Sequence, residues 1–157
     1  MKTCKSIVAL STLALLAACG GSGQEATVPQ AQPAEASYVE IGDHVVHFSA
    51  QLTNQLPLNV AQAYNIERNP NRAMLTVSVL EKGSNKAVAA DITVKTVNLT
   101  GQLKDVTIRR INEQEAIYYI GETDVRNQEV LVFDISIQPD GVDSASNVRF
   151  KRQFYTE

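Results

Sequence analysis

The chain has 157 residues, of which 14 are basic and 17 are acidic, and 44% are hydrophobic. A chain of this length suits a single domain once a targeting segment has been removed. The excess of acidic residues disfavours nucleic acid and anionic lipid headgroups as partners, because both require a basic surface.

The first 18 residues have the composition of a signal peptide. Lys2 and Lys5 supply a positive start, residues 7–16 form an apolar run, and Ala17 and Ala18 are small residues that a signal peptidase accepts. The run is too short to cross a bilayer, which requires roughly 20 apolar residues. We therefore expect residues 1–18 to be removed, which leaves 12 of the 14 basic residues against 17 acidic ones, a balance of −5.

Cys19 follows the small residues in the string Leu16-Ala17-Ala18-Cys19, which resembles the lipobox of bacterial lipoproteins. The resemblance implies cleavage before Cys19, diacylglyceryl on its thiol and an acylated amino terminus. Because each buried methylene contributes about 0.8 kcal/mol, two or three acyl chains anchor a protein durably. Gly20, where an aspartate commonly retains such proteins inside, favours the outer membrane, facing the periplasm. The alternative is a secretory signal that merely ends near a cysteine.

Residues 20–37 read as a flexible tether rich in Gly, Ala, Gln, Pro and Ser. Such a coil spans roughly 20 to 25 Å root-mean-square, enough to lift a small domain clear of the headgroups. With Cys4 removed and Cys19 acylated, no disulfide can form in the mature domain. The folded domain is therefore predicted over residues 38–157, stabilised by burial alone.

Alternating apolar residues are the dominant pattern in this domain. In residues 73–80, Ala73, Leu75, Val77 and Val79 share one face, which predicts a strand. A turn at residues 83–85 and a second alternating run over 90–99 predict a hairpin. Pro57 suits the first turn of a short helix over 57–64. Further strands are predicted over 46–52, 103–111, 116–121, 129–138 and 148–155.

About seven strands at this spacing predict an all-β, immunoglobulin-like antiparallel β-sandwich with one short helix, and a small β-barrel is the alternative. The domain also resembles a family of proteobacterial lipoproteins known as domain of unknown function 4426. The resemblance covers nearly all of residues 38–157 and implies no particular activity. It is carried by the strings Val46-His47-Phe48-Ser49-Ala50, Ala61-Gln62-Ala63-Tyr64-Asn65-Ile66, Asn71-Arg72-Ala73, Asn98-Leu99-Thr100-Gly101-Gln102, Ala116-Ile117-Tyr118-Tyr119 and Phe154-Tyr155.

Groups capable of catalysis or metal binding are sparse. His44 and His47, the only histidines, would face opposite ways in a strand, whereas zinc requires three or four converging ligands. We expect His47 in or beside the sandwich, hydrogen-bonded, and His44 in solvent. Ser49 lies on the same face as His47, but no local signature of an activated nucleophile is present. We therefore predict no catalytic residues, no metal, no cofactor and no enzyme activity.

Candidate partner-binding residues come from two segments. Residues 64–72 form a loop in which Arg68 and Arg72 can bind a partner carboxylate and Tyr64 can stack. The alternative for Arg72 is an ion pair that closes the end of the sandwich. Of Tyr118 and Tyr119, one must face the core if the strand is half buried, and the other can contact a partner.

Two classes of function remain open. The first is a non-catalytic module for protein binding or envelope assembly, which lends a strand edge to an envelope protein and predicts an exposed edge or apolar patch. The second is a small-ligand-binding protein or a hydrolase, which predicts a sizeable closed pocket lined by convergent polar groups.

Overall fold

The computed structural model describes residues 37–156. The predicted signal peptide 1–18, the predicted lipidation site Cys19 and the tether up to residue 36 lie outside the described residues. Within them, neither helical segment has the length and apolarity that a bilayer span requires.

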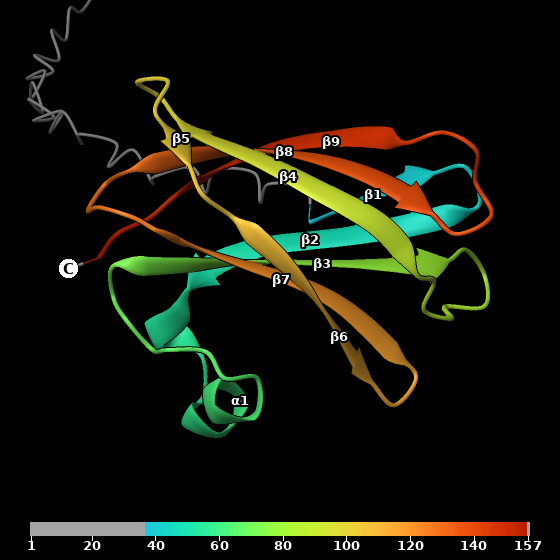
Figure 1. The fold of residues 1–157 in the computed structure, drawn as a ribbon, viewed down its shortest axis with the longest axis horizontal. Helices are drawn as coiled ribbons and strands as arrows, with labels where there is room; N and C mark the ends of the chain where they lie inside the picture. Colours follow the sequence, from blue (N-terminus) through green and yellow to red (C-terminus); the bar gives the residue numbers. More distant parts are fainter. Residues whose placement is uncertain (1–36, 157) are drawn as a thin grey trace, which may run out of the picture. The chain divides into compact units, whose positions relative to one another are not determined.

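The described residues form two antiparallel sheets (Figure 1). The five-stranded sheet has the order β1-β2-β3-β7-β6, with bounds Tyr38–Ile41, His44–Leu52, Arg72–Glu81, Ala116–Asp124 and Thr107–Glu113. The four-stranded sheet has the order β5-β4-β8-β9, with bounds Leu103–Lys104, Ala90–Asn98, Val130–Pro139 and Ser146–Gln153.

The strand order confirms the predicted immunoglobulin-like sandwich. In the order in which they pair within each sheet, β2-β3-β7-β6 correspond to strands A, B, E and D of an immunoglobulin domain, and β5-β4-β8-β9 correspond to C′, C, F and G. Strand β1 is an addition at the edge beside β2. Both sheets remain open, so the small-barrel alternative is wrong.

The main core lies between the two sheets, because each long strand turns its apolar face inward. Val46 and Phe48 of β2 are buried, as are Val77 of β3 and Phe133 of β8. The Phe150 ring of β9 lies 4.8 Å from the Phe48 ring and 4.9 Å from the Phe133 ring, measured between centroids. Three aromatic rings therefore join the sheets, within the distance range of favourable aromatic pairs.

Two predictions about strand pairing are wrong. Residues 73–80 and 90–99 do not form a hairpin, because β3 pairs with β2 and β7, whereas β4 pairs with β8 and β5. An isolated bridge between Leu80 and Ala87 joins the end of β3 to the connecting segment, before the chain crosses to the other sheet. The predicted strand over 103–111 is likewise divided, since the chain leaves the four-stranded sheet after Lys104 and joins the other as β6.

The predicted short helix is confirmed as α1, Leu58–Ala63, with Pro57 as its N-cap. Together with the 3₁₀ turn η1, Thr53–Gln55, it belongs to a segment that covers the outer face of the five-stranded sheet. Figure 1 shows α1 on the side of that sheet away from β4 and β8. A second, smaller hydrophobic cluster lies under this segment, made of Leu56, Ala61, Ile66, Met74 and Ile120.

The histidines are placed opposite to the expectation. Because Val46 and Phe48 point inward, His47 points outward and is exposed, with its ring centroid 5.9 Å from that of Tyr38. His44 is half-buried. The two histidine side chains do face opposite ways, as predicted, because they lie at positions of opposite parity in β2.

Candidate functional site

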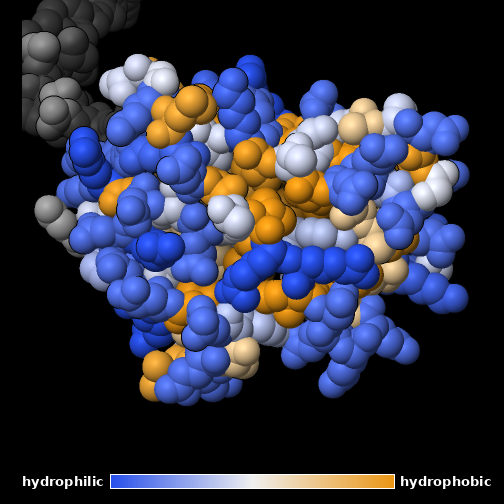
Figure 2. All heavy atoms as spheres, in the orientation of Figure 1, coloured by the Kyte–Doolittle hydropathy of each residue, from blue (hydrophilic) through white to orange (hydrophobic). Residues whose placement is uncertain are grey.

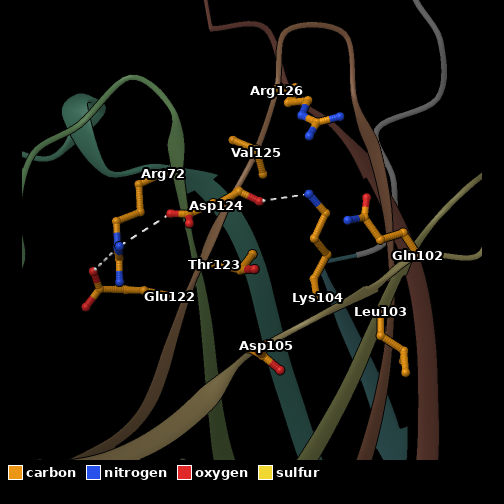
Figure 3. Close-up of a pocket in the computed structure, with 10 residues that line it drawn as sticks. All are labelled: Arg72, Gln102, Leu103, Lys104, Asp105, Glu122, Thr123, Asp124, Val125 and Arg126. Atoms are coloured by element: carbon orange, nitrogen blue, oxygen red, sulfur yellow. Dashed lines mark hydrogen bonds and ion pairs between the residues drawn. The ribbon is translucent and has the colours of Figure 1, made fainter.

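Arg72 lies at the rim of a charged hollow of about 430 Å³ at one end of the sandwich. Figure 3 labels the ten residues that line it, which come from the start of β3, the end of β7 and the β5 region. They include three cations, Arg72, Lys104 and Arg126, and three anions, Asp105, Glu122 and Asp124. The hollow is open to solvent, and its lining is mostly polar.

The guanidinium of Arg72 is held by two carboxylates of β7. Its Nε lies 3.0 Å from Glu122 Oε2 and its Nη1 lies 3.4 Å from Asp124 Oδ1 (Figure 3). The strand register already places Arg72 opposite Asp124. Arg72 therefore forms the ion pair that closes the end of the sandwich, which is the alternative role predicted for it from sequence. Because its side chain is 38% exposed, these pairs contribute little to stability.

A better buried ion pair, Lys104 with Glu129, lies beside the hollow. Their charged atoms are 2.9 Å apart, and the side chains are only 12% and 10% exposed. Asn98 Nδ2 and the backbone N–H of Arg126 donate to the Glu129 carboxylate at 3.0 and 2.9 Å. Burial alone would raise the pKa of Glu129, but the hydrogen bonds from Asn98, Lys104 and Arg126 outweigh it and lower the pKa. The carboxylate of Glu129 therefore stays ionised at neutral pH, and its hydrogen bonds fix this end of the domain.

Tyr64 belongs to a different surface, where the covering segment meets β6. Its hydroxyl donates a hydrogen bond to the carboxylate of Glu113, and this bond raises the pKa of the tyrosine. Its carbonyl accepts a hydrogen bond of 2.6 Å from Arg109, whose guanidinium also lies 3.7 Å from Glu122. These contacts tie the end of α1 to the outer face of the five-stranded sheet.

Arg68 binds locally, since its Nη2 donates to the carbonyl of Asn54 at 2.6 Å. It therefore stabilises the link between η1 and the loop, and it does not converge with Arg72 on one point. Tyr118 lies half-buried beside the smaller cluster on the outer face of β7, near Tyr64. The side chains of residues 64–72 therefore lie on two different surfaces. Of the predicted partner-binding residues, Tyr64 and Tyr118 lie beside the same cluster.

Tyr119 is a core residue, 4% exposed. Its hydroxyl accepts a hydrogen bond of 2.7 Å from the backbone N–H of Ala90, which is also buried. The bond crosses the core from β7 to β4 and links the two sheets. The pair Tyr118-Tyr119 therefore divides as the alternation of a half-buried strand requires, with Tyr118 as the one accessible to a partner.

The side chains around the hollow at Arg72 are mainly charged. In the described part of the chain, no group of three or more His, Cys, Asp and Glu side chains converges as metal ligands. Of the charged side chains around the hollow, those of Asp105 and Arg126 make no ion pair within residues 37–156. Such a surface can bind polar or charged groups of a partner.

Exposed apolar side chains lie on the four-stranded sheet, close to this hollow. Leu99 is 66% exposed and Leu103 is 64% exposed. The register places Leu103 opposite Val97, and Val97 opposite Val132, so these three residues form one row across the sheet. The sequence pattern does not predict this row, because Leu103, Val97 and Val132 come from three different strands.

Comparison with known proteins identifies the family. The model of the family described as domain of unknown function (DUF4426) matches residues 38–157. The crystal structure of a DUF4426 family protein from Pseudomonas aeruginosa PAO1 is 29% identical in sequence, with a TM-score of 0.67 over 76% of this chain and 94% of that chain.

A more distant similarity concerns the fold alone. FetP of uropathogenic Escherichia coli strain F11, recombinantly expressed in the periplasm of E. coli, is 10% identical, with a TM-score of 0.52 over 75% of this chain and 92% of that chain. No curated protein matches the chain. Because the family model covers the entire predicted domain, the chain belongs to the DUF4426 family.

Proposed function

We propose that this protein is a lipid-anchored lipoprotein of the bacterial envelope whose sandwich is a non-catalytic module for protein binding or envelope assembly. Acylation at Cys19 would hold it in the outer membrane, facing the periplasm, and residues 20–37 would serve as the tether. The lipobox-like string and Gly20 support this location.

The exposed apolar row on the four-stranded sheet is the observation that carries the proposal. Leu99 and Leu103 are large hydrophobic side chains, about two thirds exposed, and Leu103 lies in one row with Val97 and Val132. Contiguous exposed apolar surface rimmed by polar residues is typical of protein interaction sites. The charged hollow at Arg72 adjoins this row through Leu103, so a partner can contact both.

A small-ligand-binding protein or hydrolase would require an enclosed pocket with convergent polar groups. The hollows found among residues 37–156 are open to solvent. At the one beside Arg72, the charges of Arg72, Glu122 and Asp124 pair with one another, and Lys104 pairs with Glu129. These observations favour the binding module. Arg68, Arg72, Tyr64 and Tyr118 remain candidate partner contacts, whereas the burial of Tyr119 favours a structural role.

Cross-linking of the acylated protein in intact cells, followed by mass-spectrometric identification, tests this function. We expect reproducible capture of one envelope protein or complex. A co-purifying small molecule with no captured protein would contradict the proposal. A Cys19→Ala variant is the control for the anchor, since it should leave the membrane fraction. If that variant stayed in the membrane fraction, the assignment of Cys19 would be wrong.

A further inference from the structure

One long stretch of β4 has no neighbouring strand on one side. Strand β8 pairs with β4 along its whole length, from Ala90 to Asn98. On the other side, β5 pairs only with Thr96 and Val97 before the chain leaves for the other sheet. Within the described residues, no strand therefore pairs with the edge of β4 from Ala90 to Lys95.

The backbone of this edge has hydrogen-bonding groups directed outward. The N–H of Ala90 donates to the Tyr119 hydroxyl, and the N–H of Asn98 donates to the Gln102 carbonyl at 3.0 Å, so both point away from β8. The register between β4 and β8 runs without a bulge. Because alternate residues of an antiparallel strand point their N–H and C=O to the same side, those of Ile92 and Val94 also point away from β8.

Apolar side chains lie beside this edge, in the gap between β4 and β6. Ile92 and Val94 of β4, Ile108 of β6 and Ile117 of β7 are only partly buried and pack against the main core. We call these four residues the apolar seam. Figure 2 shows hydrophobic residues gathered in the middle of the visible face, over the region between β4 and β6 in Figure 1.

An exposed arginine, Arg110, lies next to the apolar seam. Arg110 of β6 pairs in register with Tyr119, which faces the core, so Arg110 is on the same face of β6 as Ile108. Its side chain is exposed, and its Nε donates to Asn112 Oδ1 at 2.9 Å. Among residues 37–156 it makes no ion pair, in contrast to Arg72, Arg109 and Arg149.

We propose that the edge of β4 from Ala90 to Lys95 accepts an extended segment of a partner protein as an added strand. The backbone of that segment pairs with Ile92 and Val94, its apolar side chains cover the apolar seam, and a carboxylate that it carries pairs with Arg110. This inference rests on the proposed function and specifies the partner: an extended segment with alternating apolar residues and an acidic residue.

The dimensions and the other edges agree with this choice. Six residues of β4 span about 20 Å, which is the length of an ordinary strand. Strand addition gains affinity from backbone hydrogen bonds and specificity from alternate side chains. The edge strand β9 instead carries exposed Lys151 and Arg152, and charges of this kind discourage pairing at a sheet edge. Asp91 and Lys95 are the exposed charges within Ala90–Lys95 of β4, and the two residues between them whose backbone points outward, Ile92 and Val94, are apolar.

Synthetic peptides test the proposal on the full chain. The probe is a fluorescent eight-residue peptide that alternates valine and threonine and has one glutamate, placed at each position in turn. A matched set has lysine in place of glutamate. Fluorescence anisotropy should show saturable binding of at least one glutamate peptide, and weaker binding of its lysine counterpart. If no glutamate peptide binds, or if both sets bind equally, the proposal is wrong.

Charge reversal at Arg110 provides the decisive comparison. Arg110→Glu should weaken binding of the glutamate peptide by about tenfold or more and strengthen binding of the lysine peptide, because like charges across an interface repel. Binding of the lysine peptide would also show that the variant is folded. Lys151→Glu, the same change at an exposed position on β9, should alter neither affinity more than about twofold. Equal effects of the two substitutions would overturn the assignment of Arg110.

Cross-linking in intact cells separates failure of this inference from failure of the proposed function. If Arg110→Glu abolishes capture of the envelope partner while Lys151→Glu preserves it, both stand. If a partner is captured equally by wild type and Arg110→Glu, the strand-addition site is wrong, and the binding function stands. If wild type captures no protein, the proposed function fails, and the inference fails with it.

Discussion

The hydrogen bond between Tyr119 and Ala90 provides a direct test of how the two sheets are held together. Tyr119→Phe removes one oxygen atom and leaves the ring in place, so it creates no appreciable cavity. The N–H of Ala90, which is 8% exposed, then loses its partner. An unsatisfied buried donor costs about 1–3 kcal/mol, so we expect the free energy of unfolding to fall by that amount.

Urea denaturation followed by circular dichroism measures this change. The midpoint should fall while the slope stays constant, because the surface exposed on unfolding is the same. For a domain of this size the melting temperature should fall by about 3–6 °C for each kcal/mol. Tyr118→Phe is the matched control and should change stability by less than about 0.5 kcal/mol, since Tyr118 is half-buried on the outer face. Equal effects of the two substitutions would refute the assignment of Tyr119 as a link between the sheets.

Two further predictions concern the core and the buried ion pair. Gly121→Ala places a Cβ 2.5 Å from Val106 Cγ1 and 2.6 Å from Ile108 Cδ1, so we expect a loss of about 1–3 kcal/mol in urea unfolding; unchanged stability would mean that these side chains move freely. Glu129 has a lowered pKa, so its contribution to stability is complete above its ordinary value of 4.5 and is lost as pH falls through the lower folded value. Glu129→Gln should therefore have a lower free energy of unfolding than wild type at pH 7, measured by urea denaturation. The difference between the two proteins should become smaller near pH 3, and a difference that does not change with pH would contradict the ion pair with Lys104.

The faces of the strands were predictable from sequence, but their distribution between the sheets was not. Alternation in residues 73–80 places Leu75, Val77 and Val79 on one buried face, as the structure has them. The same alternation is expected if residues 73–80 pair with residues 90–99 in one sheet, and also if the two segments face each other across the core. Sequence alone therefore does not distinguish these arrangements, and the predicted hairpin is wrong. The change of sheet after Lys104 coincides with a break in the alternation, since Leu103 and Val106 fall on opposite faces, but such a break does not indicate which sheet the chain joins.

Contacts between distant residues account for what the sequence could not predict about the candidate site. Lys104 and Glu129 are 25 residues apart, and Tyr64 and Glu113 are 49 apart. Neither pair lies in a recognisable motif. Arg72 was correctly considered for an ion pair at the end of the sandwich, but its partners Glu122 and Asp124 became evident only from the strand register. The uncovered edge of β4 likewise depends on where β5 ends.

Amide hydrogen exchange at the edge of β4 tests the central claim most directly. In the free protein, the N–H groups of Ile92 and Val94 should exchange faster than those of Thr93 and Lys95, which point toward β8. In the complex with the captured envelope partner, or with the tightest-binding glutamate peptide, exchange at Ile92 and Val94 should slow markedly while the edge of β9 stays unchanged. Protection confined to residues 146–153, or no change at Ile92 and Val94, would contradict strand addition at β4.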